Sequence, residues 1–389
     1  MDLALYDNRF GYYARAAQRS GRAGDFLTSV DVGPLFGELL ETQLAEMFAI
    51  VNSQSSIQHF DLVEAGAGNG RLSADILRAA RQKHQAFYNA LRLHLVEASK
   101  EARASQPGTL GEVAERLASS TDSLPDRVEG AIFANELLDA VPTHQVVMRE
   151  NGLREIYVDA NPSDPAQLIA REGAVSTPRL ASYLGELGVA LEPGWRVEIN
   201  LRAVEWIRDA ARRLQRGFMI LIDYGHSARD LYSASHSGGT LTTFSGHTMA
   251  GPEVSADSPP WLRDPGNRDI TSHVDFTSVR AAAEAEGLTT IAFLDQTYFL
   301  MGLLGVEGSR GSRGSRGSRG STGSRGSTGS GDSSENPLNL LNRLNLSQRL
   351  ALKTLVMPGG LGSTFKVMIL GQGVGTPALA GCSYRVRVT

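Results

Sequence analysis

The chain has 389 residues, a formal net charge of -4 at pH 7 and a hydrophobic content of 41%. These values are ordinary for a soluble globular protein and allow one large domain or two or three smaller ones. The net charge gives no electrostatic reason to expect nucleic acid or an anionic membrane as the main partner. The single cysteine, Cys382, excludes an intrachain disulfide framework and a cysteine-rich zinc site.

The sequence also bears on cellular location. No apolar run reaches transmembrane length, so we expect no membrane insertion. The first residues lack the apolar stretch of a signal peptide, and Asp2 and Asp7 are unlike the acid-poor presequences of mitochondrial proteins. Together with the near absence of cysteine, these features predict a cytoplasmic protein.

The N-terminal part combines an aromatic-rich segment, residues 3–13, with an amphipathic helix that begins after Pro34. Between them lies the loop 24–29. A loop that precedes a packed helix can hold polar side chains over a neighbouring pocket, so we take Gly24 and Asp25 as candidate cofactor-binding residues. A plain capping loop explains the same residues equally well.

A glycine-rich turn follows the first predicted strand. The strand ends in Glu64, and Gly66, Gly68 and Gly70 precede a helical pattern. The dinucleotide fingerprint fails because Arg71 occupies its last position, and no Gly-Lys-Ser/Thr follows to make a P-loop. The spacing resembles motif I of the S-adenosylmethionine-dependent methyltransferases, which makes these four residues candidate cofactor ligands. A purely structural turn is the alternative.

A second buried strand, residues 92–97, ends in Glu97. An acidic side chain at this strand end can accept hydrogen bonds from a ribose diol, as in dinucleotide-binding folds. Glu97 is therefore a further candidate cofactor ligand. The alternative is an exposed glutamate stabilised by the dipole of the next helix.

The third predicted strand, residues 131–134, is followed by Asn135, Glu136 and Asp139. Open α/β sheets bind their ligands at the carboxyl ends of such strands. Two carboxylates there can hold a cationic or amine substrate, so we take these three residues as candidate catalytic residues. Alternatively, Asn135 caps a helix and Glu136 favours its N-terminus.

The second half of the chain predicts a hairpin at 144–158 inside an inserted lobe, then strands at 195–201 and 217–224 on either side of a helix. A polar cluster, residues 223–226, follows the second of these strands. Residues 240–269 have the composition of a loop. His226, His247 and His273 lack the close spacing of a zinc helix, so we predict no metal site.

A low-complexity tract, residues 308–331, consists mainly of Gly-Ser-Arg and Gly-Ser-Thr repeats. It cannot bury enough apolar surface to offset its ordering entropy, so we expect a flexible insertion rather than an RNA-binding segment. A helix at 338–355 and a last strand at 364–370 follow.

Several blocks together resemble the MidA family of methyltransferases, whose mitochondrial branch comprises the arginine methyltransferases of respiratory complex I assembly. The most specific are Asn-Glu-Leu-Leu-Asp at 135–139 and Ile-Asp-Tyr-Gly at 222–225. The others are 3–6, 11–13, 24–26, 35–39, 63–70, 94–97, 140–142, 269–276 and 365–367. Family members usually carry a further N-terminal helical segment, and the Gly-Ser-Arg tract is not part of the family pattern.

The resemblance implies a class I methyltransferase fold: α/β, doubly wound and Rossmann-like, with a mainly parallel sheet, helices on both faces and an inserted small lobe. It also implies S-adenosyl-L-methionine as the cofactor and a protein arginine as the acceptor, with a respiratory complex subunit as one candidate partner. A non-catalytic assembly factor and a small-molecule methyltransferase remain alternatives.

We expect six parts in the chain. They are an N-terminal segment and helix that cover the cofactor pocket (1–58), a cofactor-binding core (59–143), a substrate lobe (144–194), the rest of the core (195–307), the disordered insertion (308–336) and a closing helix and strand (337–389).

Overall fold

The computed structural model describes residues 1–14, 28–55, 57–245, 248–251, 259–313, 344–356 and 364–384. Its main feature is a sheet with the strand order β14-β15-β9-β4-β1-β2-β3, in which β13 (Val274–Asp275) also pairs with β9. The strands are β1 (Phe60–Ala65), β2 (Leu91–Val96), β3 (Leu117–Thr121), β4 (Val128–Asn135), β9 (Leu214–His226), β14 (Thr289–Asp295) and β15 (Phe365–Gln372). Only β15 runs antiparallel to its neighbours in this order, so the predicted mainly parallel α/β sheet is confirmed.

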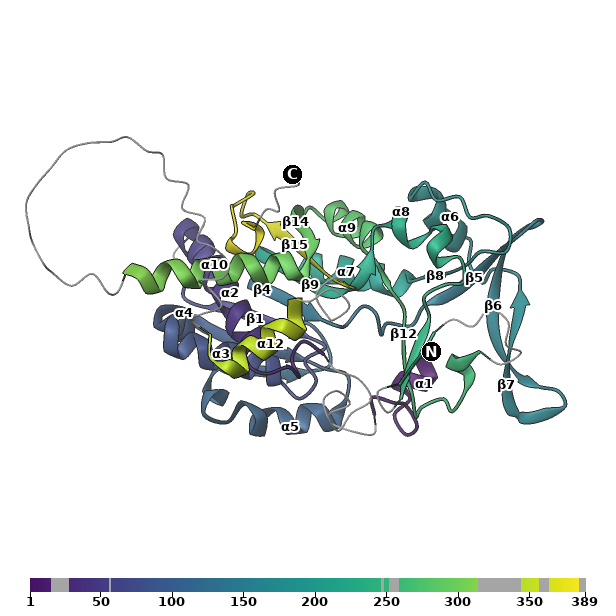
Figure 1. Ribbon diagram of the computed structural model, residues 1–389, viewed down its shortest axis with the longest axis horizontal. Helices are drawn as coiled ribbons and strands as arrows, with labels where there is room; N and C mark the ends of the chain where they lie inside the picture. Colours follow the sequence, from purple (N-terminus) through teal and green to yellow (C-terminus); the bar gives the residue numbers. More distant parts are fainter. Residues whose placement is uncertain are drawn as a thin grey trace, which may run out of the picture.

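Helices cover both faces of this sheet (Figure 1). Alternate residues of β9 point to opposite faces, so Ile220 packs in one hydrophobic core and Leu221 in the other. One core includes α2 (Leu35–Ser55), α3 (Arg71–Lys83), α4 (Gln85–Ala90), α10 (Gln296–Arg313) and α12 (Leu346–Val356); the other includes α6 (Arg179–Glu186), α7 (Leu201–Arg213) and α9 (Phe276–Ala285). Helix α5 (Lys100–Leu110) and the short η1 (Gly111–Arg116) connect β2 to β3.

Gly217 allows the central strands β4 and β9 to lie close together. Gly130 and Gly217 are paired in register and have φ angles of 153° and 130°. A Cβ atom on Gly217 would lie 1.8 Å from the carbonyl oxygen of Gly130. Only glycine fits at this position, because any side chain would collide with the neighbouring main chain.

A small antiparallel sheet forms the lobe on the right of Figure 1. Its strands are β5 (His144–Arg149), β6 (Gly152–Asn161), β7 (Asp164–Gly173) and β8 (Arg196–Ile199), in the order β7-β6-β5-β8. The predicted hairpin is present as β5 and β6. The predicted strand 195–201 was expected in the core, but β8 pairs with β5 and therefore belongs to the lobe.

Residues 240–269, predicted to be a loop, contribute to a second small sheet made of β10 (Thr242–Ser245), β11 (Thr248–Ala250) and β12 (Asp269–Thr271). The N-terminal helix α1 (Asp2–Tyr6) packs against it through Leu5, which shares a small core with Tyr12, Leu241 and Ile270. Apolar contact with this distant segment gives the region an order that its polar composition did not indicate.

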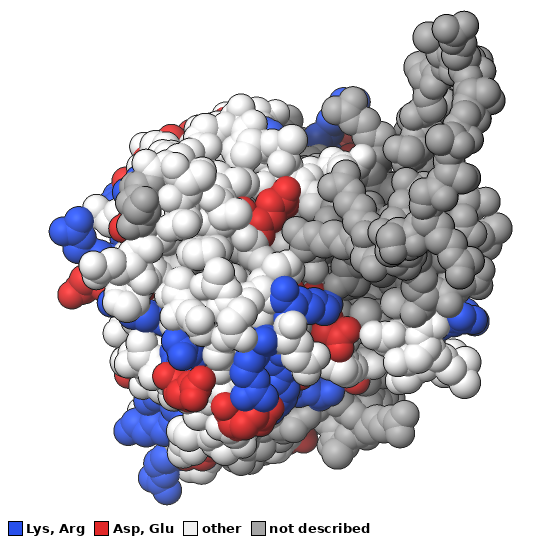
Figure 2. All heavy atoms as spheres, turned by 90° about the vertical axis from the view of Figure 1, so that its left-hand side faces the viewer, with Lys and Arg blue, Asp and Glu red and all other residues white. Residues whose placement is uncertain are grey.

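The tract predicted to be flexible is in part helical, because α10 continues to Arg313. Residues 314–343, including most of this tract, lie outside the described residues, as do the candidate cofactor ligands Gly24 and Asp25. Among the described helices, none has the length and apolarity needed to cross a bilayer. On the face shown in Figure 2, basic and acidic side chains are interspersed.

The glycine pair generates a stability prediction. We expect Gly217→Ala to lower the free energy of unfolding by about 3 kcal/mol or more, because the new methyl group forces β4 and β9 apart. Gly185→Ala is the matched control: it adds a methyl group on the exposed side of α6, where no atom lies within 4 Å, and should raise stability by about 0.5 to 1 kcal/mol. Urea unfolding followed by circular dichroism measures both, and equal effects would contradict the packing argument.

Candidate active site

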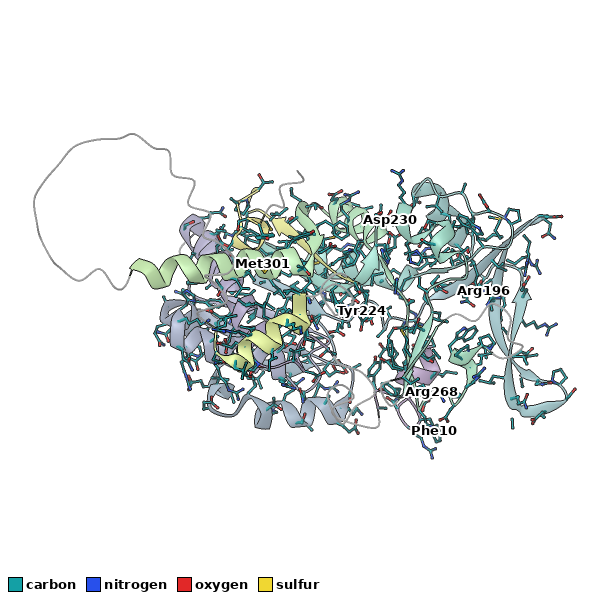
Figure 3. The ribbon with its side chains drawn as sticks, in the orientation of Figure 1. Phe10, Arg196, Tyr224, Asp230, Arg268 and Met301 are labelled. Carbon is teal, nitrogen blue, oxygen red and sulfur yellow. The ribbon has the colours of Figure 1, made fainter. Side chains whose placement is uncertain are left out.

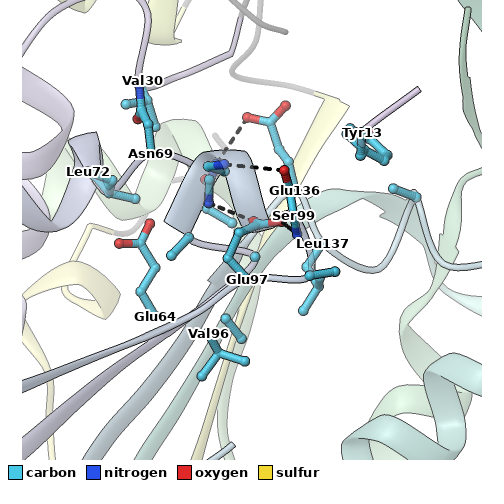
Figure 4. Close-up of a pocket in the computed structure, with 18 of the residues that line it drawn as sticks. Tyr13, Val30, Glu64, Asn69, Leu72, Val96, Glu97, Ser99, Glu136 and Leu137 are labelled. Atoms are coloured by element: carbon cyan, nitrogen blue, oxygen red, sulfur yellow. Dashed lines mark hydrogen bonds between the residues drawn. The ribbon is translucent and has the colours of Figure 1, made fainter. Parts of the chain in front are cut away.

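A cavity of about 330 Å³ lies at the carboxyl ends of β1, β2 and β4 (Figure 4). This is the edge of the sheet where the chain order reverses, between β1 and β4, and where open α/β sheets bind their ligands. Its volume falls in the range of small-molecule sites. The residues used below that line it are Tyr6, Tyr13, Asp31, Glu64, Gly66, Gly68, Arg71, Glu97, Ser99, Asn135 and Glu136.

The glycine turn forms one wall of the cavity. Gly66, Gly68 and Gly70 have φ angles of 72°, 50° and 81°, all in the left-handed region. A Cβ atom on Gly68 would meet no protein atom within 4 Å, whereas one on Gly66 or Gly70 would press on a leucine side chain. Gly68 thus lets a ligand approach the main chain, and Gly70, which does not line the cavity, serves the turn itself.

Glu97 holds this turn in place. One carboxylate oxygen accepts the N–H of Gly68 at 2.8 Å, and the other accepts the N–H of Ser99 at the same distance. Gln106 holds the opposite side of the same residue by donating to the Gly68 carbonyl oxygen at 2.8 Å. Because a carboxylate oxygen has two lone pairs, Glu97 keeps acceptor capacity toward the cavity.

Glu64 lies at the end of β1 and is only 4% exposed. The hydroxyl of Ser73, on α3, donates to its carboxylate. Burial raises the pKa of Glu64 to about 8, and this hydrogen bond offsets only part of the rise. Glu64 therefore offers a carboxyl group that becomes a strong acceptor when a cationic group binds beside it.

Asn135 and Glu136 form another wall of the cavity, at the end of β4. Glu136 has a φ angle of 54°, a strained conformation for a residue other than glycine. Its carboxylate accepts hydrogen bonds from Tyr224 Oη and from Asn135 Nδ2, each at 3.1 Å. Burial raises its pKa to about 8, and the nearby Asp223 adds to the rise. The alternative that Asn135 caps a helix is wrong, because no helix follows β4 before β5.

Asp223, at the end of β9, fixes the segment after Glu136. One of its carboxylate oxygens accepts N–H groups from Leu137, Leu138 and Asp139, at 3.2, 2.8 and 3.3 Å. Burial raises the pKa of Asp223 to about 7, although these backbone donors favour its charged form. Asp139 is 3% exposed and does not line the cavity.

The N-terminal segment closes the cavity from the other side. Tyr6 donates to the carbonyl oxygen of Ala140 at 3.0 Å, and Tyr13 donates to Asp269 at 2.8 Å. Asp31 forms an ion pair with Arg71, the residue that follows the glycine turn, at 3.2 Å. Residues on both sides of the undescribed stretch 15–27 therefore line the cavity.

Of the residues predicted from sequence, the structure brings six together around the cavity: Glu64, Gly66, Gly68, Glu97, Asn135 and Glu136. It leaves Gly70 and Asp139 outside the lining. Sequence reasoning missed Tyr6, Tyr13, Asp223 and Tyr224 as site residues. The block 222–225 at a strand end signalled the last two, but their contact with the Glu136 segment depends on β9 lying beside β4.

The cavity also fits the cofactor that the glycine turn suggests. Gly68 leaves room for a flat or extended ligand against the main chain. The Glu97 carboxylate can accept further hydrogen bonds from hydroxyl groups. Glu64 provides an acidic group for a cationic end. The fold and this site are those of a class I S-adenosylmethionine-dependent methyltransferase.

Comparisons with known proteins identify the family. Residues 39–294 match the model of a family of S-adenosyl-L-methionine-dependent methyltransferases, Methyltransf_28, and the chain belongs to that family. The resemblance stated from the sequence is thereby confirmed, as are the enzyme class and the cofactor, S-adenosyl-L-methionine.

Two curated relatives are named "Protein arginine methyltransferase NDUFAF7, mitochondrial". The one from Danio rerio is 30% identical over 73% of this chain and 67% of its own length, and the one from Mus musculus is 28% identical over 75% and 67%. The relatives are mitochondrial proteins by name, so the prediction of a cytoplasmic protein is contradicted.

A solved structure agrees with the fold. It is that of a COG1565 superfamily member from Burkholderia thailandensis bound to S-adenosyl-homocysteine. Its TM-score is 0.78 at 25% sequence identity, and the match covers 98% of this chain and 88% of that one.

The open wall at Gly68 generates a binding prediction. We expect Gly68→Val to weaken S-adenosylmethionine binding at least about 100-fold, because its side chain enters the cavity. Gly188→Val is the matched control, since Gly188 has a similar φ angle of 65° and equally open surroundings but lies outside the cavity. Isothermal titration calorimetry measures both affinities. A loss of binding that both variants share would point to backbone strain instead.

The raised pKa of Glu64 generates a pH prediction. Between pH 4.5 and about 8 the unfolded chain releases this proton while the folded protein keeps it, so wild-type stability falls as the pH rises. Glu64→Gln removes this dependence. The free energy of unfolding of the variant, relative to that of the wild type, should increase by up to about 4 kcal/mol from pH 5 to pH 8. Urea unfolding without cofactor measures this difference. A difference that stays constant with pH would be inconsistent with a buried, protonated Glu64.

Proposed function

We propose that the protein transfers a methyl group to an arginine side chain of a protein substrate and that Glu136 receives this arginine. The observation that carries the proposal is the Glu136 carboxylate at the cavity wall, held by hydrogen bonds from Tyr224 and Asn135. A carboxylate at this place can both bind a cation and accept a proton.

The donor side would be formed by Glu64, Gly66, Gly68 and Glu97. S-adenosylmethionine, when bound, supplies a methyl group on a positively charged sulfur. Gly68 would admit the ligand to the main chain, Glu97 would accept its ribose hydroxyls, and Glu64 would face its cationic end. Gly70 supports this side indirectly through the shape of the turn.

The acceptor side needs a base, because an arginine guanidinium is protonated at neutral pH and carries only donor groups. Glu136 meets this need: its pKa of about 8 is close to the working pH, where a general base is most effective. The two hydrogen bonds from Tyr224 and Asn135 fix its orientation, and Asn135 Oδ1 is a buried acceptor with no hydrogen-bond partner among the described residues. Both residues therefore suit N–H groups of a guanidinium.

Asp139 has a different role in this proposal from the catalytic one expected from sequence. It is buried behind the cavity, and its backbone N–H donates to Asp223. Burial, and then the charges of Asp223 and Glu136, raise its pKa well above the usual range. We assign Asp139 to positioning of the segment that carries Glu136, and the candidate cofactor ligands Gly24 and Asp25 remain proposals without a described position.

The relatives support the choice of acceptor, since their printed names specify protein arginine methylation. The family resemblance adds a respiratory complex subunit as the proposed protein substrate. The lobe of β5 to β8, which lies beside the core in Figure 3, is the proposed surface for that substrate.

Glu136→Gln tests the proposal. We expect at least about a 1,000-fold loss of methyl transfer with donor affinity changed less than about threefold, because the amide keeps the shape of the side chain but not its basicity. The assay supplies tritiated S-adenosylmethionine and a bacterial lysate as the source of acceptor proteins. Acid hydrolysis and amino-acid analysis then separate methylarginine from methyllysine.

Glu101→Gln, a change on the exposed first turn of α5, serves as the control and should keep full activity. Label found only in lysine or only in small molecules would overturn the arginine assignment. Equal loss of donor binding and transfer in Glu136→Gln would show that Glu136 belongs to the donor site.

A further inference from the structure

Three histidines from separate segments meet outside the cavity of the active site. His226 ends β9, His236 ends the short helix η2 (Ala234–His236), and His273 directly precedes β13. One ring nitrogen of each lies within 4.8 Å of those of the other two, and the ring centroids are 4.9, 5.2 and 5.9 Å apart. None of the three lines the active-site cavity.

The backbone brings these residues together. β13 pairs with β9 in parallel, with Val274 opposite Gly225 and Asp275 opposite His226, so His273 lies beside β9 only two positions from His226 in register. Gly225 permits this approach, because a Cβ there would lie 2.1 Å from the carbonyl oxygen of Val274. After β9, the short helix α8 (Ala228–Leu231), which carries Asp230 in Figure 3, leads the chain to η2. Strand pairing therefore brings His226 and His273 together, and η2 adds His236.

Hydrogen bonding selects one nitrogen of His236 as a ligand. Its Nδ1 lies 3.0 Å from the carbonyl oxygen of Asp230. A carbonyl oxygen only accepts, so Nδ1 carries the proton and Nε2 keeps its lone pair. This arrangement, in which a histidine donates its other N–H to a carbonyl group, is the usual second contact of metal-binding histidines.

His273 has a buried ring nitrogen that is available to a ligand. Its Nδ1 is buried and has no hydrogen-bond partner among the described residues, although its backbone N–H donates to Thr240. A buried polar atom without a partner is rare and calls for a ligand or a bound ion.

We propose that His226, His236 and His273 bind a divalent transition metal ion, for which zinc is the best match. Three imidazole ligands suit zinc and its neighbours, whereas magnesium and calcium require oxygen ligands. Tetrahedral zinc with bonds of about 2.0 to 2.1 Å places its nitrogen ligands about 3.4 Å apart. The ring nitrogens lie within 4.8 Å of one another and would move closer together on binding an ion.

The bound ion would stabilise the segments that support the loop carrying Glu136. Ser272, next to His273, donates its N–H to the carbonyl oxygen of Asp139 at 3.0 Å. Asp139 in turn donates to Asp223, in the same strand as His226. The metal would thus tie together both segments that support the loop carrying Glu136, without contacting donor or acceptor.

The test uses the full chain, purified without a histidine tag and freed of metal by a chelator. Titration with zinc chloride should load about one ion per chain by mass spectrometry and raise the melting temperature. Cobalt(II) should give visible absorption bands of a low-symmetry site with nitrogen ligands. Magnesium chloride should produce neither effect.

His226→Ala and His236→Ala should each weaken zinc binding at least about 100-fold, since losing a direct ligand costs more than losing an outer partner. His59→Ala, which changes an exposed histidine before β1, is the control and should bind as the wild type does. Loading far below one ion per chain, an unchanged cobalt spectrum of the wild-type protein, or binding that survives both variants would each overturn the proposal. These measurements use neither methyl donor nor acceptor, so their outcome is independent of the proposed function.

Discussion

The acidic side of the pocket depends on one buried carboxylate, that of Asp223. It accepts three consecutive backbone N–H groups from the segment after Glu136. This anchor compensates for the strained backbone of Glu136, whose left-handed conformation costs of order 1 to 3 kcal/mol. The anchor exists only because β9 lies directly against β4, and that contact requires glycine at position 217. The position of a reactive side chain thus follows from a strand spacing set far from the pocket.

Burial also determines the protonation of the acidic side chains around Glu136. Glu136, Asp139 and Asp223 lie close together in a poorly solvated environment, and burial raises the pKa of all three. Carboxylates in such a cluster cannot all be charged at neutral pH, since each disfavours the ionisation of the others. An arriving cation relieves this repulsion. The site is therefore better suited to a positively charged acceptor than to a neutral one, which agrees with the proposed arginine.

Much of the fold was predictable because its signals are local. The apolar strands, the glycine turn and the helix after Pro34 follow from periodicity and from the conformational freedom of glycine, and the carboxyl-end rule then placed Glu64, Glu97, Asn135 and Glu136 around one cavity. What failed depends on contacts between distant segments. No periodic pattern in the sequence predicts three of these contacts. They are the pairing of β8 with β5, the packing of Leu5 with Ile270 and the proximity of His236 and His273. Asp139 has the right spacing, but the turn after β4 directs it behind the cavity.

The order of strands has a consequence for how the chain is made. β15 lies between β9 and β14 in the sheet, yet it is the last of the three in the sequence. During synthesis, β9 and β14 therefore leave the ribosome before the strand that joins them, and each has an unpaired edge in the interval. Val367 and Ile369 of β15 also complete the core beneath α10. The nascent protein thus carries an open sheet until β15 has been made, and this is the stage at which it depends most on protection from aggregation.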